Sequence, residues 1–486
     1  MLFKQLSEYS QPKMGVLSEN QKNALHSASL EILQRTGVSV RLDDTRNRLA
    51  KAGCQVDNDR VFIPERLIEW ALNQHPKHVV LCDRNATPAM ALEGRNCYFG
   101  TGSDTPFVID INSGLHRSAV IADIENVSRL ADALHNLDFL MCMGIASDVR
   151  PEISDLYHFQ AMVSNTIKPI VFTAWNASNL EAILRMAETV AGSLENLLRY
   201  PFVALYAEPT APLIHSQIGC EKLEVICRLG LPLVYTPGLI TGASSPVSHA
   251  GAIVVANAEI LSGLLITQLI NPGTPVIAGG GGMMTMDMHS MIASYGAPEF
   301  MFDWCSLREM GAFYGLPVFG FAGVSDALIF DQQAGIEGAL WTLISALSGG
   351  NLIHDVGYLE SGLTTSYEMI VAMDETIGLV KRFMQGMLVN NDTLAINTIA
   401  SVGPGGHFLD VPHTLDHFRE NWRPDIFCHS NRPDWNEAGA SPLGDRALRK
   451  VKTILSQHKP EPLPQHVTEN IKSIINNATS RLGRMD

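Results

Sequence analysis

Short apolar runs alternate with helical segments over most of the chain, and this alternation constrains the fold more than any other feature. Each run ends at a polar or glycine-proline corner before the next helical pattern begins. The runs lie at 97–101, 139–146, 169–174, 202–207, 232–235, 275–278, 317–321 and 352–354. Short β-rich runs that alternate with helices favour a parallel α/β fold.

The number of these units indicates a closed barrel. Helical patterns follow the runs at 123–136, 153–166, 179–194, 217–229, 248–270, 298–314, 332–348 and 366–384. Eight strand–helix units close a parallel (β/α)8 TIM barrel. Several runs begin with proline, as at Pro169, Pro232 and Pro317, where the missing N–H costs least and the preceding helix ends. A doubly wound open sheet is the less favoured alternative.

Two extensions flank the predicted barrel. Residues 1–95 are expected to form a mostly helical, mixed N-terminal extension, and 96–388 the catalytic barrel domain. After about residue 388 the pattern breaks into an irregular segment rich in glycine, proline, histidine and aromatic residues. The tail is largely amphipathic helix. We expect residues 389–486 to form a C-terminal extension packed on the barrel.

Composition excludes several classes of protein. The formal net charge is -15, which argues against binding to nucleic acid or to an anionic membrane surface. The eight cysteines form no CxxC pair, so buried thiols in a reducing cytoplasm are expected. The longest apolar stretch, 250–270, is interrupted by Asn257, Glu259 and Gln268, and therefore predicts a buried helix and not a membrane span.

Aromatic residues recur where the predicted strands end. Ligands bind at the carboxyl ends of parallel barrel strands, which we call the barrel mouth. The aromatic candidates there are Trp175, Tyr206, Tyr235 and Phe321, joined by Tyr98, Phe330 and Tyr358. Aromatic faces bind a quaternary ammonium, which has no N–H to donate, through cation–π contacts. The alternative is that these rings only pack within the barrel layers.

Carboxylates are also predicted at the mouth. They are Asp104, Asp148, Glu208, Asp326 and Asp355. Each would stabilise a bound cation, or would cap the helix that follows. Capping is at least as well supported for Asp148 and Asp326. Glu208 is a poor cap because Pro209 follows it, so a functional role is favoured there.

The glycine run at 279–282 resembles a phosphate-binding loop only superficially. It lacks the GxGxxG spacing and the Lys-Ser/Thr of a P-loop. Small residues instead permit close approach of a large planar partner or of another backbone. No zinc motif is present, and His413 and His417, spaced i,i+4, supply too few ligands. We therefore predict no metal bound by the chain itself.

Several motifs together resemble a known family. They are GTGSDTPFVID at 100–110, YAEPTAPL at 206–213, FAGVSDALIFDQQAG at 321–335, GPGGHFLDVPHTLDHFRENWRP at 403–424, and the GASSPV and AGGGG corners. They are similar to the trimethylamine methyltransferase family. The resemblance implies a barrel enzyme that passes a methyl group from an amine to cobalamin, carried by a separate corrinoid protein. Gly279, Gly280, Gly281 and Gly282 would then face the corrinoid.

The resemblance also indicates a branch of the family. Its trimethylamine enzymes carry pyrrolysine in the barrel, and the nearest position in this chain is Leu328. A standard residue there implies the non-pyrrolysine branch, which demethylates quaternary amines. Such a donor already carries the positive charge and releases a neutral amine, so the protein mainly supplies binding and alignment. For that reason we assign no single catalytic residue.

Glycine betaine is the methyl donor that we expect, with dimethylglycine as the product. Carnitine, γ-butyrobetaine and proline betaine are alternative donors. His354 is the first choice to bind the substrate carboxylate, although it would equally bond a barrel carbonyl. A non-catalytic betaine-binding protein or corrinoid-protein scaffold is the alternative of another class. A zinc methyltransferase is disfavoured by the missing Cys/His set. A homo-oligomer is expected.

Overall fold

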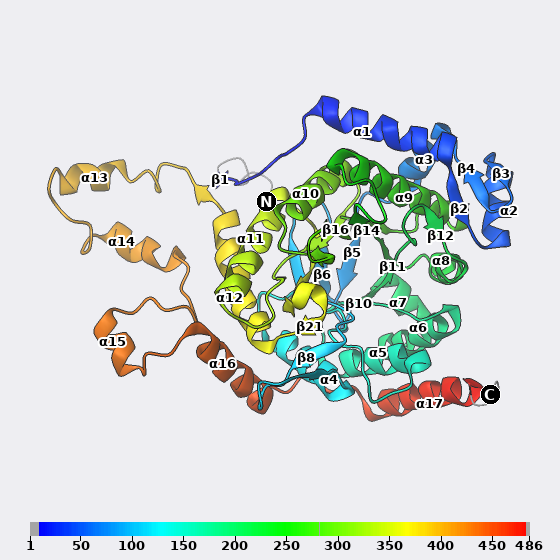
Figure 1. The fold of residues 1–486 in the computed structure, drawn as a ribbon. Coiled ribbons are helices and arrows are strands. Elements are labelled where there is room, and N and C mark those ends of the chain that lie inside the picture. The colour runs from blue at the N-terminus through cyan, green and yellow to red at the C-terminus, as the bar shows by residue number, and fades with distance from the viewer. Residues whose placement is uncertain (1–8, 281, 483–486) are drawn as a thin grey trace.

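The barrel is built from parallel strands in the order that the chain predicts. The structure is a computed structural model that describes residues 9–280 and 282–482 (Figure 1). One parallel sheet has the order β10-β11-β13-β15-β18-β19-β7. Its strands are β7 (Tyr98–Thr101), β10 (Ile170–Phe172), β11 (Val203–Ala207), β13 (Leu233–Tyr235), β15 (Val276–Gly279), β18 (Val318–Phe321) and β19 (Leu352–Val356).

An eighth strand position closes this sheet into a barrel. Parallel bridges join Gly100 to Phe139 and Leu140 to Ile170, so the segment around 139–140 lies between β7 and β10. Every strand therefore has a neighbour on both sides. The predicted (β/α)8 barrel is confirmed, and the open sheet is excluded.

Helices surround the barrel as its outer layer (Figure 1). They are α4 (Ile121–Ala133), α5 (Ser154–Asn165), α6 (Ala177–Ala191), α7 (Leu194–Arg199), α8 (Gln217–Leu229), α9 (His249–Ile270), α10 (Pro298–Phe313), α11 (Gln332–Ser348) and α12 (Tyr367–Met384). Among the described residues, α9 alone has the length and hydropathy of a membrane span, and 78% of that apolar window is buried. The predicted buried helix is therefore what the structure shows.

Strand alternation divides the apolar core in two. The inward side chains form a separate interior cluster that includes Phe139, Val171, Ala204, Val234, Ile277, Phe319 and Leu352. Residues of the antiparallel hairpin β5 (Val80–Cys82) and β6 (Pro88–Ala91) complete this cluster. Because Cys82 N–H donates to the carbonyl of Pro201, which precedes β11, the hairpin closes the amino end of the barrel. The lumen is thus accessible from its carboxyl end.

Several short sheets lie outside the barrel sheet. The N-terminal extension contains α1 (Glu19–Glu31), a π-helical turn (Ile32–Thr36), β2 (Val38–Val40), α2 (Asp43–Ala52), β3 (Gln55–Asp57), β4 (Arg60–Phe62) and α3 (Glu65–Gln74). Around the mouth lie β8 (Phe107–Ile109), β9 (His116–Ser118), β12 (Ile214–His215), β14 (Gly238–Thr241), β16 (Gly282–Asp287), β17 (Ile292–Ser294), β20 (Tyr358–Leu359) and β21 (Thr364–Thr365).

The two parts of the C-terminal extension differ in whether they pack on the barrel. Its last helices, α16 (Leu443–Gln457) and α17 (Gln465–Leu482), pack on α12 and α6 respectively. By contrast, α13 (Ile396–Val402), α14 (Pro412–His417) and α15 (Arg432–Glu437) extend away from the barrel (Figure 1). The expectation that the whole of 389–486 packs on the barrel is therefore met only by its C-terminal part.

Candidate active site at the barrel mouth

Asp355 is the most unusual group at the mouth. It follows His354 at the end of β19, has a φ of 74°, and its side chain is only 2% exposed. Neither carboxylate oxygen has an aligned hydrogen-bond partner among the described residues. The basic side chain beside it is His354, whose Nε2 lies 3.0 Å from Oδ1 without the alignment of a hydrogen bond. A buried, unsatisfied carboxylate is costly, which makes it the mark of a site that receives a ligand.

Three buried phenol groups lie within electrostatic reach of this carboxylate. Burial raises the pKa of Tyr206, Tyr295 and Tyr358, and the Asp355 charge adds to the shift in each. Tyr206 points into the lumen, where its ring lies 5.8 Å from that of Phe319. A negative charge among aromatic faces is the physical complement of an organic cation.

His354 is held by the barrel wall. Its Nδ1 donates to the carbonyl of Gly320 over 2.7 Å, and its ring lies 4.1 Å from that of Phe319 and 5.0 Å from that of Phe321. Because Nδ1 donates to this carbonyl, Nε2 is the nitrogen that faces Asp355, 3.0 Å from its Oδ1. His354 therefore does bond a barrel carbonyl, and its other nitrogen still faces the mouth.

Two further carboxylates lie nearby. Burial raises the pKa of Asp104 to about 6, while hydrogen bonds from Ser103 and Thr173 oppose the shift and the Glu208 charge increases it. Glu208 accepts a hydrogen bond of 3.3 Å from the Tyr206 hydroxyl. Although water reaches Glu208, protein surrounds it on most sides in this concave mouth, and burial raises its pKa.

Lys222, on α8, supplies a positive charge at the same mouth. Its Nζ donates to the carbonyl of Ala174 over 3.1 Å. Burial lowers the pKa of Lys222, and the charges of Glu208, Asp155 and Asp104 oppose that shift. Sequence reasoning missed Lys222 and Tyr295 because neither follows a barrel strand directly. Tyr295 lies between β17 and α10, where its N–H donates to Asp326 over 2.7 Å.

Three predicted mouth residues lie elsewhere. Tyr98 begins β7 and is therefore at the barrel floor, where its hydroxyl accepts from the Ala91 N–H over 3.1 Å. Tyr235 points outward because Val234 faces the lumen. Phe330 packs beside α16 near Gly444. The expectation that these rings line the mouth is wrong.

The remaining aromatic candidates differ in their surroundings. Trp175 is at the mouth but 57% exposed. Phe321 is buried and packs against the rings of Tyr295, Phe300, Trp341 and His354. The Tyr358 ring fills the space that the missing side chain of Gly102 leaves, and its hydroxyl bonds the backbone of Ser103. Tyr206 therefore has the least constrained ring of the lumen.

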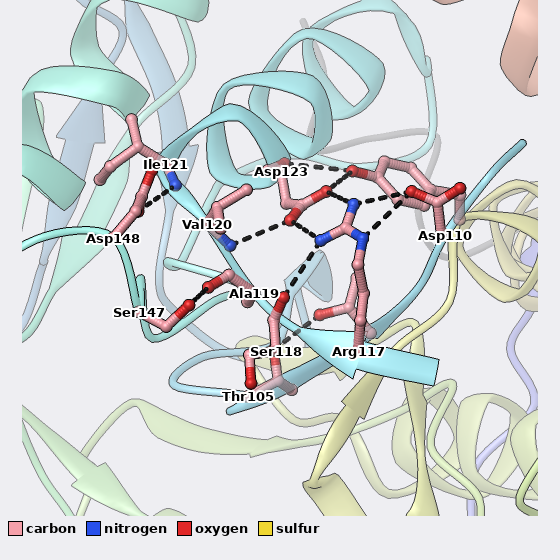
Figure 2. Close-up of polar contacts among 12 residues, drawn as sticks. Thr105, Asp110, Arg117, Ser118, Ala119, Val120, Ile121, Asp123, Ser147 and Asp148 are labelled. Carbon is pink, nitrogen blue, oxygen red and sulfur yellow. Dashed lines mark hydrogen bonds and ion pairs between the residues drawn. The ribbon is translucent and has the colours of Figure 1, made fainter. Parts of the chain in front are cut away.

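Two of the predicted carboxylates, Asp148 and Asp326, accept hydrogen bonds from backbone N–H groups. The Asp148 carboxylate accepts from the Ile121 N–H at the start of α4 over 3.0 Å, as Figure 2 shows. The Asp326 carboxylate accepts from Tyr295 N–H and, over 2.8 Å, from Gly296 N–H. Asp148 thus caps α4, the helix that precedes it in the chain, and not the helix that follows it as the capping alternative supposed. Asp326 fixes the loop that carries Tyr295.

The glycine run has an internal packing role. A Cβ on Gly279 would lie 2.1 Å from that of Thr236, and one on Gly280 would lie 2.2 Å from Trp304 Nε1. The surroundings of Gly282 are more open, and Gly281 lies outside the described residues. Close approach of the protein's own side chains therefore explains Gly279 and Gly280.

A groove of about 790 Å³ adjoins the mouth. It contains Leu328, which is 68% exposed. Its lining includes Ser294, which precedes Tyr295 in the chain, and Asp326, whose carboxylate accepts from the Tyr295 N–H. Its exposed apolar lining includes Val247, Met288, Ile292, Leu328 and Leu363. The groove is therefore separate from the buried carboxylate but continuous with the loop beside it.

No group of three or more histidine, cysteine, aspartate or glutamate side chains suited to a metal occurs within 9–280 and 282–482. The rings of His413 and His417 are in tilted contact, with centroids 4.3 Å apart. His417 pairs with Glu420 over 2.8 Å and with Asp392 over 3.4 Å. These histidines thus contribute to local structure in α14.

Fold and mouth together define a barrel enzyme that works at the carboxyl ends of its strands. The chain matches the protein family described as trimethylamine methyltransferase (MTTB) over residues 3–483. It therefore belongs to the trimethylamine methyltransferase family, and it is a methyltransferase of the corrinoid-dependent kind.

Similar proteins include enzymes named for trimethylamine and for glycine betaine. Trimethylamine methyltransferase MttB of Desulfitobacterium hafniense is 30% identical over 471 residues, which covers 96% of this chain and 94% of that protein. A glycine betaine methyltransferase of Desulfitobacterium hafniense is 27% identical over 467 residues, covering 96% and 97%. The crystal structure of the Methanosarcina barkeri monomethylamine methyltransferase has a TM-score of 0.51 at 12% identity and covers 90% of this chain and 88% of that one. This last likeness supports the fold alone.

Proposed function

We propose that the protein transfers a methyl group from glycine betaine to the cobalt of a corrinoid carried by a partner protein, and releases dimethylglycine. The observation that carries this proposal is the buried Asp355 carboxylate without aligned partners, with Tyr206, Tyr295 and Tyr358 within reach of its charge. A trimethylammonium group has no N–H, so it satisfies such a carboxylate by charge and the rings by cation–π contact.

The basic groups of the mouth favour a zwitterionic donor. Lys222 and His354 lie among the same carboxylates, and either would bind the carboxylate of a betaine. Trimethylamine offers no such group. The glycine betaine methyltransferase relative supports this choice, as does the ordinary leucine at position 328.

The chain's own part in the reaction is binding and alignment. When bound, the corrinoid supplies the cobalt nucleophile that accepts the methyl group. The C–N bond breaks with its electron pair left on nitrogen, so the leaving amine is neutral and needs no proton. Asp355 and the rings hold the ammonium and exclude water, which orients one methyl group towards the open mouth. The groove around Leu328 is the surface that we assign to the corrinoid.

The direct test is methyl transfer to Co(I)-cobalamin with glycine betaine, carnitine, γ-butyrobetaine, proline betaine and trimethylamine. We expect the highest kcat/KM with glycine betaine. Preference for a longer betaine would move the substrate assignment, and transfer from trimethylamine alone would overturn it. Tight betaine binding without transfer, even with the cognate corrinoid protein, would favour the scaffold alternative.

A further inference from the structure

Lys222 is a half-buried cation to which the described chain gives no ion-pair partner. It lies in the second turn of α8, the helix that follows β11 at the mouth. An ammonium group has three N–H donors. Within residues 9–280 and 282–482, the acceptor that Nζ meets is the carbonyl of Ala174 at 3.1 Å. Lys222 therefore has N–H groups left for an acceptor from outside the chain.

The carboxylates near Lys222 hold hydrogen bonds of their own. The charges of Glu208, Asp155 and Asp104 favour its protonated form, whereas burial lowers its pKa. Asp155 accepts from the Trp175 N–H over 2.7 Å. Hydrogen bonds from other side chains likewise act to lower the pKa of Asp104 and of Glu208. These acids thus support the charge on Lys222 without occupying its remaining N–H groups.

Lys168 shows the contrasting case of a lysine with a structural role. Its Nζ donates to the carbonyls of Ala131, Leu134 and Leu137, each at 2.6 Å. All three donors are used there, at the C-terminal end of α4. Lys222 makes one such bond, so binding the backbone does not account for its place at the mouth.

Lys222 and the unsatisfied Asp355 lie on opposite sides of the barrel. Asp355 is on β19, and Lys222 is on the helix that follows β11. Around the barrel, β13, β15 and β18 separate β11 from β19 in one direction, and β10, the segment 139–140 and β7 separate them in the other. Two opposite charges held apart across one mouth are the complement of a zwitterion, whose ammonium faces the anion and whose carboxylate faces the cation.

His354 is a poorer partner than Lys222 for a substrate carboxylate. Its Nδ1 already donates to the carbonyl of Gly320 over 2.7 Å, and its Nε2 lies 3.0 Å from Asp355 Oδ1. A second carboxylate at Nε2 would therefore lie against that of Asp355, and two carboxylates that share one site repel each other.

We propose that Lys222 binds the substrate carboxylate and thereby makes the enzyme selective for zwitterionic quaternary amines. The inference rests on the proposed function and assigns the two ends of the donor, the ammonium group to Asp355 and the carboxylate to Lys222. A charge-assisted hydrogen bond fixes the carboxylate end, which orients the methyl groups at the other end. Tetramethylammonium has no carboxylate, so it gains nothing from Lys222 and meets a like charge there.

Calorimetric titration of the full chain, without a corrinoid protein, tests this assignment with two ligands, glycine betaine and tetramethylammonium. The wild type should bind glycine betaine more tightly. Lys222→Met should raise the Kd for glycine betaine about 10- to 100-fold, because a hydrogen bond between charged groups is lost. The Kd for tetramethylammonium should stay the same or fall. Lys222→Arg, which keeps the charge, should retain the preference for glycine betaine.

Two further variants separate this role from a structural one. Lys168→Met is the matched control, which should lower the melting temperature and leave the ratio of the two Kd values unchanged. His354→Gln should also keep the preference for glycine betaine. Equal losses for both ligands in Lys222→Met, or a preference that disappears in His354→Gln and survives in Lys222→Met, would overturn the inference.

The proposed function is judged by a separate measurement, methyl transfer from glycine betaine by the wild type. If that transfer occurs while the preference for glycine betaine survives Lys222→Met, the assignment of Lys222 is wrong and the proposed function stands. If the wild type transfers no methyl group from any quaternary amine, the proposed function is wrong and the selectivity assigned to Lys222 is overturned with it.

Discussion

Two pairs of a tyrosine and a histidine lie on opposite sides of the barrel wall. Outside, His215 is satisfied at both nitrogens, by the Tyr235 hydroxyl at 2.6 Å and the Ser262 hydroxyl at 2.9 Å, and burial lowers its pKa to about 4. Inside, His354 lies beside Asp355, whose oxygens lack aligned partners within the described chain, and the Asp355 charge contributes to the raised pKa of Tyr206. The same residue types thus form a closed structural network on one side and an open, charged one on the other.

The largest effect should follow Asp355→Asn. We expect kcat/KM for the quaternary amine to fall about 100-fold or more, roughly 3 kcal/mol, because the buried charge that faces the cation is lost. The melting temperature should stay the same or rise, since an unsatisfied buried carboxylate is costly. Steady-state kinetics and calorimetry check both expectations.

Asp123 is the matched control for Asp355. It is also buried, but its carboxylate pairs with Arg117 at 2.7 and 2.9 Å and accepts from the Val120 N–H at 3.0 Å (Figure 2). Asp123→Asn should therefore lower the melting temperature and leave kcat/KM unchanged. Equal losses of activity in the two variants would mean that Asp355 is only structural.

Glu259 adjoins the outer network because its carbonyl accepts from the Ser262 hydroxyl over 3.1 Å, and it tests that side of the wall through pH. Burial raises its pKa to about 7, and its carboxylate accepts from the Leu213 N–H over 2.6 Å. A pKa raised on folding gives stability that is complete below about 4.5 and is lost as the pH rises through about 7. Glu259→Gln should remove this loss, which amounts to about 3 kcal/mol at most. Unfolding free energies at pH 5 and pH 8 provide the measurement, and parallel wild-type and variant profiles would contradict it.

Tyr235→Phe and Tyr206→Phe compare the two sides directly. Tyr235→Phe leaves His215 Nδ1 without its partner, so we expect about 1–3 kcal/mol less stability and an unchanged KM. Tyr206→Phe removes a hydroxyl that donates only to Glu208, so stability should hold while KM rises. If both variants lose stability, or both raise KM, the outer and inner networks do not differ in role as we expect.

Sequence patterns located the barrel well for a physical reason. Apolar periodicity and the prolines and glycines at element ends determine where strands and helices begin, and the predicted 217–229 and 332–348 are the bounds of α8 and α11. The same periodicity misplaced Tyr235, since a shift of one residue along a strand turns a side chain to the other face.

Tyr295 and Lys222 have no sequence pattern around them that predicts their place at the mouth. Tyr295 comes within range of the Asp355 charge from a loop after β17, and Lys222 comes within range of the Glu208, Asp155 and Asp104 charges from a helix. Their approach depends on tertiary packing, which no spacing in the chain records. Glu208 was predicted at the mouth because the proline after it argues against the common alternative of a helix cap.

The pH dependence of substrate binding is a smaller effect. Burial raises the pKa of Asp104 to about 6, so its carboxyl is ionised above that pH and neutral below it. KM for the quaternary amine should rise as the pH falls through 6, by about tenfold or less. In Asp104→Asn this dependence should vanish, with KM fixed near the low-pH value. A wild-type KM that is flat between pH 5 and 7.5 would remove Asp104 from the site.

The smallest effect should come from Trp175→Ala. Trp175 is 57% exposed, and a cation–π contact at an exposed position contributes about 0.5–1 kcal/mol, so KM should rise about fivefold at most. Tyr206→Ala should raise it more, because that ring lies inside the lumen beside the buried charge. Both variants are measured with glycine betaine at saturating cobalamin. A larger effect from Trp175 would place the cation at the rim of the mouth, outside the network that separates the two sides of the wall.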